Sequence, residues 1–132
     1  MKIEKFASIF DGLKEAYGYF KIEKTGSNGK AQGKAGVTRE PRTPELWKNH
    51  LLGKGTGLGI IPINEDNNCK WGCIDIDQYP LDHKLLVEKI RRLKLPLVVC
   101  RSKSGGAHCF LFSTEWVEAR DMQKALQHMS SA

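Results

Sequence analysis

Two aspartates, Asp75 and Asp77, are the residues whose type and spacing first suggest chemistry. They lie in the apolar run WGCIDIDQYP (71–80) and alternate with Ile74 and Ile76. Because side chains two apart on a strand point to the same face, we expect the carboxylates to project together, about 6–7 Å apart. Like charges at this spacing repel unless a cation lies between them. A hard divalent ion, Mg²⁺ or Mn²⁺, is therefore the expected counter-charge, and an ordinary surface D-x-D is the alternative.

A basic turn between two predicted strands, RSKSGGAHCFLF (101–112), is the second candidate. Its glycines let the backbone approach a ligand closely, and its amides and hydroxyls suit an anion. The residues expected to hold phosphates are Arg101, Ser102, Lys103, Ser104, Gly105, Gly106 and His108. Beside a metal at the aspartates, they describe a site for a nucleoside triphosphate. The alternative is a common hairpin turn followed by a structural histidine.

Hydrophobic periodicity predicts the elements that position these residues. From residue 70 the pattern predicts strand, helix, strand, strand and helix, at 70–76, 81–93, 97–101, 108–112 and 114 to about 129. These are five elements of the βαββαβ unit found in ferredoxin-like and RNA-recognition folds, which belong to the α+β class. The last strand has no counterpart, so we expect this sequence to be an N-terminal fragment.

The first part of the chain is predicted to be helical and basic. Apolar residues from Ile3 to Phe20 recur every three or four positions, which predicts a helix of about 15–18 residues. The glycine-rich segment 21–42 is predicted to form a basic loop or an exposed hairpin.

Two elements are expected between this segment and the metal strand. A helix begins at Thr43, which is followed by proline, and ends at Gly53. The stretch 57–63 is predicted to be a strand. We therefore expect 1–54 to form an N-terminal part of the domain and 55–132 its incomplete catalytic core.

The charge balance favours a polyanionic partner. The chain has 132 residues, a formal net charge of +6 and a pI near 9.2, which favours nucleic acid as the partner. A solvated basic loop without a partner is the alternative. The candidate nucleic-acid-binding residues are Lys24, Lys30, Lys34, Arg39, Arg42 and Lys54.

Cysteines and hydropathy bear on the class of protein. No apolar run is long enough to span a membrane, and the N-terminal segment carries acidic residues that a signal peptide would lack. The four cysteines are Cys69, Cys73, Cys100 and Cys109, and without an export signal they indicate a reducing compartment. Free thiols on strands are favoured over a zinc site, because C-x3-C has no second ligand pair.

The two motifs together resemble those of archaeo-eukaryotic primases. The strand Asp75-Ile76-Asp77, followed by Ser104-Gly105-Gly106-Ala107-His108, is most similar to the primase–polymerase domains of phages, mobile elements and TOTE conflict systems. The resemblance runs from about Thr43 to Leu126. It implies that Asp75 and Asp77 bind the metal, and that Ser104 and His108 hold the phosphates of the incoming nucleotide.

The resemblance also implies an activity. The expected reaction is DNA primase or polymerase-type nucleotidyl transfer in DNA replication, with Mg²⁺ or Mn²⁺, a dNTP or NTP, and a single-stranded DNA template. A helicase domain or protein is a further candidate partner. The expected location is the cytoplasm of a bacterial or archaeal cell, with a phage gene as one source.

One part of the family pattern is not found. Its third motif, another acid on a later strand, has no counterpart, because Glu115, Glu118 and Asp121 fall in the predicted last helix. A catalytically incomplete module that binds nucleotide and nucleic acid is therefore an alternative to the enzyme. A metal-dependent nuclease is a third, although a nuclease does not need a triphosphate cradle.

Overall fold

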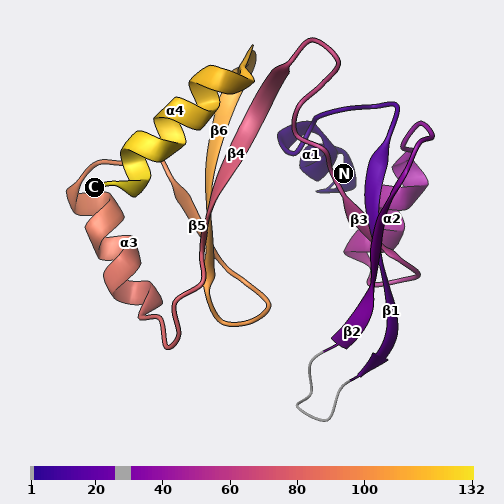
Figure 1. The fold of residues 1–132 in the computed structure, drawn as a ribbon, viewed down its shortest axis with the longest axis horizontal. Helices are drawn as coiled ribbons and strands as arrows, with labels where there is room; N and C mark the ends of the chain where they lie inside the picture. Colours follow the sequence, from indigo (N-terminus) through magenta and orange to yellow (C-terminus); the bar gives the residue numbers. More distant parts are fainter. Residues whose placement is uncertain (1, 26–30) are drawn as a thin grey trace. The chain divides into compact units, whose positions relative to one another are not determined.

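The computed structural model describes residues 2–25 and 31–132 as two compact units, Met1–Asn67 and Asn68–Ala132 (Figure 1). The predicted α+β class is confirmed. The first unit contains α1 (Lys2–Ile9), β1 (Tyr17–Thr25), β2 (Ala31–Thr38), α2 (Pro44–Leu51) and β3 (Gly57–Gly59). The second contains β4 (Asn68–Ile76), α3 (His83–Arg92), β5 (Val98–Arg101), β6 (Ala107–Glu118) and α4 (Ala119–Ser130). Across these described ranges, no helix is both long and apolar enough to cross a bilayer.

The second unit has the predicted β-α-β-β-α order. Its sheet has the strand order β4-β6-β5, and β6 is antiparallel to both neighbours. β4 and β5 are therefore parallel, and α3 connects them. The last helix begins later than predicted, because β6 continues to Glu118 and α4 starts at Ala119. Thr114 and Trp116 favour an extended backbone, and this preference overrides the helical pattern.

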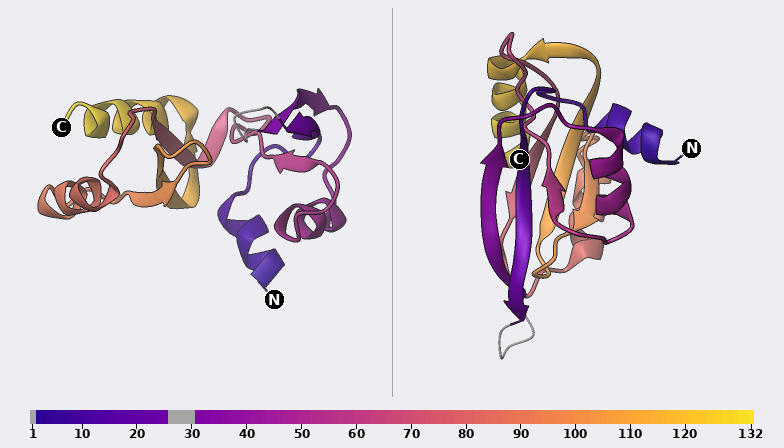
Figure 2. Two further views of the ribbon diagram at one scale, coloured as in Figure 1. Left: turned by 90° about the horizontal axis from the view of Figure 1, so that it is seen from below. Right: turned by 90° about the vertical axis from the view of Figure 1, so that its right-hand side faces the viewer.

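Both helices of the second unit cover one face of its sheet (Figures 1 and 2). A Cβ at Gly72 of β4 would lie 2.6 Å from Leu126 Cδ1 and 3.0 Å from Met122 Cγ, so α4 packs directly on this face. An apolar cavity of about 160 Å³ lies between the sheet and the helices, lined among others by Ile74, Ile90 and Met129. Strand alternation therefore places Trp71, Cys73 and Asp75 on the opposite face.

Aromatic side chains continue this opposite face onto β6. Phe112 pairs with Trp71, Phe110 with Cys73 and His108 with Asp75. The ring centroid of Phe110 lies 5.8 Å from that of Phe112, 6.0 Å from that of Trp71 and 6.0 Å from that of His108. The packed rings fix the backbone on which His108 and Asp75 stand.

A long hairpin dominates the first unit (Figure 2). The sheet order is β2-β1-β3, and all pairings are antiparallel. The hairpin was one of the two predictions for 21–42. β3, which the sequence grouped with the catalytic core, pairs with β1 and lies in the first unit. The strand predicted over 57–63 is shorter in the structure and ends at Gly59. Pro62 lies in the rest of the predicted stretch, and it has no N–H that could donate a hydrogen bond to a neighbouring strand.

The long N-terminal helix predicted from Ile3 to Phe20 is wrong. α1 ends at Ile9, and β1 begins at Tyr17. At Gly12 a Cβ would lie 2.1 Å from the Ile61 carbonyl oxygen, so the chain turns closely against another segment where a helix was expected.

Candidate functional site

Asp75 and His108 form the centre of the candidate site. They are direct partners in the β4–β6 register, and His108 Nε2 lies 3.4 Å from Asp75 Oδ1, with both side chains partly exposed to solvent. Pairing of two strands thus joins the aspartate motif to the turn motif. The exposure of both groups leaves room for a ligand to approach them.

Tyr79 connects the second aspartate to the turn. Its hydroxyl donates to Asp77 Oδ1 at 3.2 Å and lies 2.8 Å from Ser104 Oγ. Asp77 stands just beyond the last residue of β4, and Ser104 belongs to the turn between β5 and β6. Two independent contacts therefore bring the aspartates beside the turn. Tyr79 was not predicted from sequence; its position two residues after Asp77 was the available signal.

The turn itself is held by glycines and by α3. Gly105 has φ +98°, a conformation that favours glycine. A Cβ at Gly106 would lie 2.1 Å from the Ile76 carbonyl oxygen, so glycine lets the turn pack against the end of β4. His83 Nε2 lies 2.8 Å from the Gly106 carbonyl oxygen. This histidine in the first turn of α3 was also missed from sequence.

The other turn residues are distributed around these contacts. Arg101 ends β5 and is exposed, as are Lys103 and Ser104. The carbonyl oxygen of Ser102 accepts a hydrogen bond from the Gly105 N–H at 3.1 Å. Its hydroxyl is buried and has no hydrogen-bond partner in the described parts of the chain. The turn therefore presents two cations and a hydroxyl to solvent, and keeps a second hydroxyl beneath its backbone.

The negative charge of Asp75 affects the pKa of a neighbouring thiol. Burial raises the pKa of Cys73 to about 11, and the charge of Asp75 adds to the increase. All four cysteines are free and lie on strands. Burial also raises the pKa of Cys69 and Cys109. These three thiols therefore stay protonated near neutral pH when no metal is bound.

The oxygen donors of the site are of the type that a hard divalent cation prefers, but two aspartates are too few to fill its coordination positions. Asp75 and Asp77 offer the carboxylates that Mg²⁺ and Mn²⁺ prefer. Within residues 2–25 and 31–132, no group of three or more His, Cys, Asp or Glu side chains is arranged to hold a metal. The remaining positions of a bound ion would then go to water and to phosphate oxygens.

The acids near the end of β6 do not complete the set. Glu115 and Glu118 lie on β6, which corrects their predicted place in the last helix, and Asp121 lies on α4. Glu118 pairs with Asn68, at the opposite end of β4 from Asp75. Glu115 is seven positions beyond His108, which corresponds to about 23 Å along a strand.

A comparison with models of protein families identifies the family to which the chain belongs. The family model of the archaeo-eukaryotic primase domain of TOTE conflict systems matches residues 1–132. The chain belongs to this family. The suspected archaeo-eukaryotic primase relationship is therefore confirmed, and it extends over both units. None of the curated proteins compared with the chain matches it.

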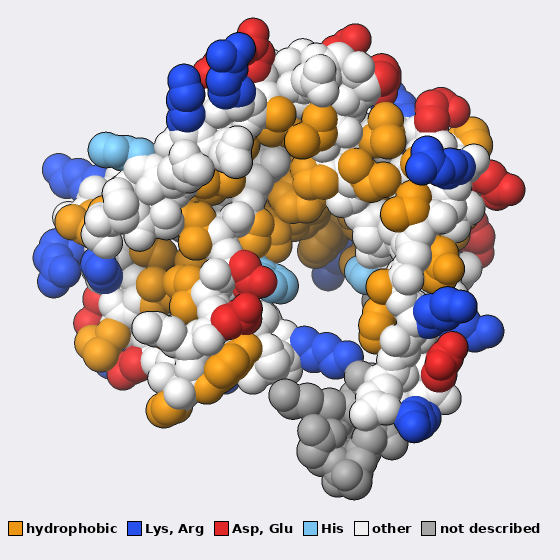
Figure 3. Space-filling model, viewed as in Figure 1, with side chains coloured by type: hydrophobic (Ala, Val, Ile, Leu, Met, Phe, Trp, Pro, Cys, Tyr) orange, Lys and Arg blue, Asp and Glu red, His pale blue; other side chains and the backbone are white. Residues whose placement is uncertain are grey.

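The primase domain carries its predicted nucleic-acid-binding cations mainly on the first unit's surface. Lys24, Lys34, Arg39 and Lys54 are exposed, and Lys and Arg side chains follow the β1–β2 hairpin on the face shown in Figure 3. Lys30 lies outside the described residues.

Arg42 has a different environment. It forms an ion pair with Asp11, and its Nε donates to the Leu13 carbonyl oxygen at 3.1 Å. Its side chain is 11% exposed. Arg42 thus connects the loop after α1 to the start of α2 in the primase domain, and its guanidinium is already engaged within the first unit.

Proposed function

We propose that this domain carries out metal-dependent nucleotidyl transfer, joining a dNTP or NTP to a 3′-hydroxyl on a single-stranded DNA template. The observation that carries the proposal is that each aspartate is linked to the turn motif, Asp75 directly and Asp77 through Tyr79. Asp75 faces His108 across β4 and β6, and Tyr79 connects Asp77 to Ser104. The carboxylates and the phosphate-binding turn would then act on one bound triphosphate.

Each residue has a role that its chemistry supports. The hydroxyl of Ser104, the Nε2–H of His108 and the cations Lys103 and Arg101 would donate to phosphate oxygens and stabilise the charge that builds up in the transition state. Asp75 and Asp77 would hold Mg²⁺ or Mn²⁺, which supplies activation of the 3′-hydroxyl and stabilisation of the leaving pyrophosphate. Tyr79 and His83 would position the turn and the second aspartate.

The hairpin is the proposed template-binding surface. Lys21 and Lys34 are direct cross-strand partners in the β1–β2 register, and both are exposed. Like charges placed opposite each other destabilise a hairpin, and neither lysine has an acidic partner among the described side chains. A phosphate backbone would relieve this repulsion. Lys24 on β1 extends the cationic row.

A second candidate function is binding without catalysis. It is favoured by the position of Glu115 and Glu118, which lie at the end of β6 distant from His108. Phosphoryl transfer usually requires several carboxylates around two metal ions. With two aspartates at the site, the domain would bind a nucleotide and a single strand, and a third acid from another segment or partner would be needed for synthesis.

Primer synthesis on single-stranded DNA distinguishes these functions. The wild-type chain and the D75N/D77N variant are incubated with labelled dNTPs or NTPs and Mg²⁺ or Mn²⁺, and products are resolved by length. Metal-dependent synthesis that the variant lacks supports the enzyme. Nucleotide binding without synthesis supports the binding module. If D75N/D77N and the wild type synthesise equal amounts of primer, the aspartates are not needed. That result would contradict the role given to them in both the enzyme and the binding module.

A further inference from the structure

The two faces of the β1–β2 hairpin differ in chemistry. Cross-strand partners share a face, and so do residues two apart on a regular strand. One face, the tyrosine–lysine face, consists of the pairs Tyr17–Thr38, Tyr19–Gly36 and Lys21–Lys34. The opposite face has no charged residue in its pairs, which are Gly18–Val37, Phe20–Ala35 and Ile22–Gly33. Aromatic rings and cations are therefore combined on one side of the hairpin.

An irregularity in β1 adds a third lysine to the tyrosine–lysine face. The register shifts by one residue between Ile22 and Lys24, so that Lys24 pairs with Gln32. Gln32 is two residues from Lys34 on β2 and shares its face. Lys24 therefore lies on the tyrosine–lysine face, whereas simple alternation would have placed it on the opposite face with Ile22. Bulges of this kind redirect side chains.

These lysines form a cationic cluster that is not neutralised within the hairpin. Lys21, Lys24 and Lys34 are all exposed. Glu23 is the single acid in the sequences of β1 and β2, and among the described side chains no ion pair joins it to a lysine. Because like charges on one face of a hairpin repel, a row of phosphates would stabilise this arrangement.

The ring of Tyr19 lies directly on the backbone of Gly36. A Cβ at Gly36 would lie 2.5 Å from the Tyr19 hydroxyl oxygen and 2.7 Å from its Cζ, so glycine alone leaves room for the ring. Tyr19 is half-buried, and part of its surface remains accessible. Lys21 follows two residues later, about 6–7 Å along the strand. A nucleotide whose base stacks on Tyr19 could therefore place a phosphate at the lysines.

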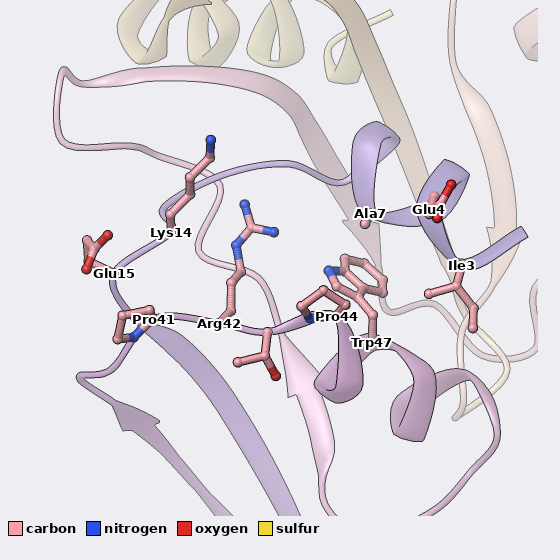
Figure 4. A pocket seen from close by; sticks show the side chains of 10 residues that line it. Ile3, Glu4, Ala7, Lys14, Glu15, Pro41, Arg42, Pro44 and Trp47 are labelled. Carbon is pink, nitrogen blue, oxygen red and sulfur yellow. The ribbon is translucent and has the colours of Figure 1, made fainter. Parts of the chain in front are cut away.

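The helices of the first unit pack beside the hairpin. The main contacts of α2 are with α1 and β3. Trp47 of α2 is buried next to a cavity of about 540 Å³, the Trp47 cavity, which Ala7 of α1 and Arg42 also line (Figure 4). The end of β1 and the start of β2 extend beyond both helices (Figure 1). The lysine end of the hairpin is therefore accessible to a ligand from outside the first unit.

We propose that an unpaired base of a single strand stacks on the ring of Tyr19 while neighbouring phosphates contact Lys21, Lys24 and Lys34. An acidic peptide would neutralise the lysines but offers no flat ring to the tyrosine. The choice of single-stranded DNA rests on the proposed function. Every base has a flat π-face, so the contact is independent of sequence, as a template requires.

A comparison of oligo(dT) with an abasic oligonucleotide of the same length separates stacking from charge, because both strands carry the same phosphates. Dissociation constants are measured by fluorescence anisotropy in EDTA, for the wild type and for D75N/D77N. We expect both proteins to bind oligo(dT) about tenfold more tightly than the abasic strand. The aspartate site is not needed for this preference. Primer synthesis by a wild type that lacks the preference would refute the stacking contact alone.

Y19L and F20L form a matched pair of variants. The two residues are adjacent on β1 and lie on opposite faces, and each ring lies over a glycine of β2, since a Cβ at Gly33 would be 2.8 Å from Phe20 Cζ. Y19L should weaken oligo(dT) binding about tenfold and leave binding of the abasic strand unchanged. F20L should keep the preference of the wild type, and so should Y19F, which retains the ring. A preference in Y19L equal to that of the wild type would overturn the proposal.

A cross-linking experiment on the wild type covers a Y19L protein that fails to fold. The oligonucleotide carries 5-iododeoxyuridine, which cross-links to aromatic side chains on irradiation, and mass spectrometry locates the modified residue. We expect the cross-link at Tyr19. Its absence from Tyr19 would contradict the stacking contact, as would equal affinity of the wild type for oligo(dT) and the abasic strand.

Discussion

His108 Nε2 on β6 lies 3.4 Å from Oδ1 of Asp75, its direct cross-strand partner on β4. The two residues are distant in sequence, and the antiparallel pairing of a central and an outer strand places them together. This register is one of two links between the aspartate motif and the glycine turn, and Tyr79 provides the other. We interpret the pair as the point where a bound triphosphate meets the metal-binding acids.

Replacing His108 by alanine should weaken triphosphate binding about tenfold, because a hydrogen bond to a charged group is lost. Binding of the corresponding deoxynucleoside, which lacks phosphates, should change much less. Dissociation constants of both ligands are measured for H108A and for H128A, which changes an exposed histidine on α4. Equal losses for nucleoside and triphosphate would assign His108 a structural role.

Tyr79→Phe should weaken triphosphate binding by about three- to tenfold without a large change in melting temperature. The substitution removes the hydroxyl contacts to Asp77 and Ser104, and the side chain is 55% exposed, so packing changes little. Titration of the same triphosphate provides the measurement. Y17F, on β1 of the first unit, is the matched control. Unchanged affinity in Y79F would show that Tyr79 does not position the site.

Neutralising the hairpin lysines should reduce the salt dependence of single-strand binding. For K21Q/K24Q/K34Q, the slope of log affinity against log salt should fall by about 2, since each phosphate contact to a single strand contributes roughly 0.7. The control K89Q/K94Q/K124Q removes the same charge from the second unit. Equal slopes in the two variants would indicate that the hairpin is a solvated surface that does not bind the single strand.

Thiol labelling should report on the site through one cysteine. Cys100 is exposed and pairs with His108, whereas Cys69 and Cys109 are buried and have raised pKa values. A raised thiol pKa lowers the thiolate fraction below that pKa, so these cysteines should react slowly at pH 8. Labelling with an aromatic disulfide should therefore show one fast thiol, which C100S removes and bound triphosphate slows. A fast phase that persists in C100S would contradict this assignment.

The second unit could be largely predicted from sequence, because its signals are local and agree. Asp82 was not singled out, yet its side chain accepts the Leu85 N–H at 3.1 Å and caps α3 near its predicted start. The alternation in β4 predicted which side chains share a face. The contact of Asp75 with His108 also required the strand order, which rested only partly on the resemblance to primases.

The first unit was predicted less well, because its segments are determined by distant contacts. Spacing from Ile3 to Phe20 matched a helix by coincidence, while Gly12 packs against the Ile61 carbonyl and β1 pairs with two strands. The role of Arg42 could not be predicted from charge, because its partner Asp11 lies far away in sequence. The Trp47 cavity likewise forms from separate segments.

The most direct test of the central claim is calorimetric titration of a dNTP and an NTP into this chain, with and without Mn²⁺. It requires only binding, so the need for a third acid does not affect it. We expect manganese-dependent binding that D75N/D77N abolishes while the variant keeps its fold, since like-charge repulsion is removed. Equal manganese-dependent affinity in D75N/D77N would contradict the claim that the aspartates and the turn form one nucleotide site.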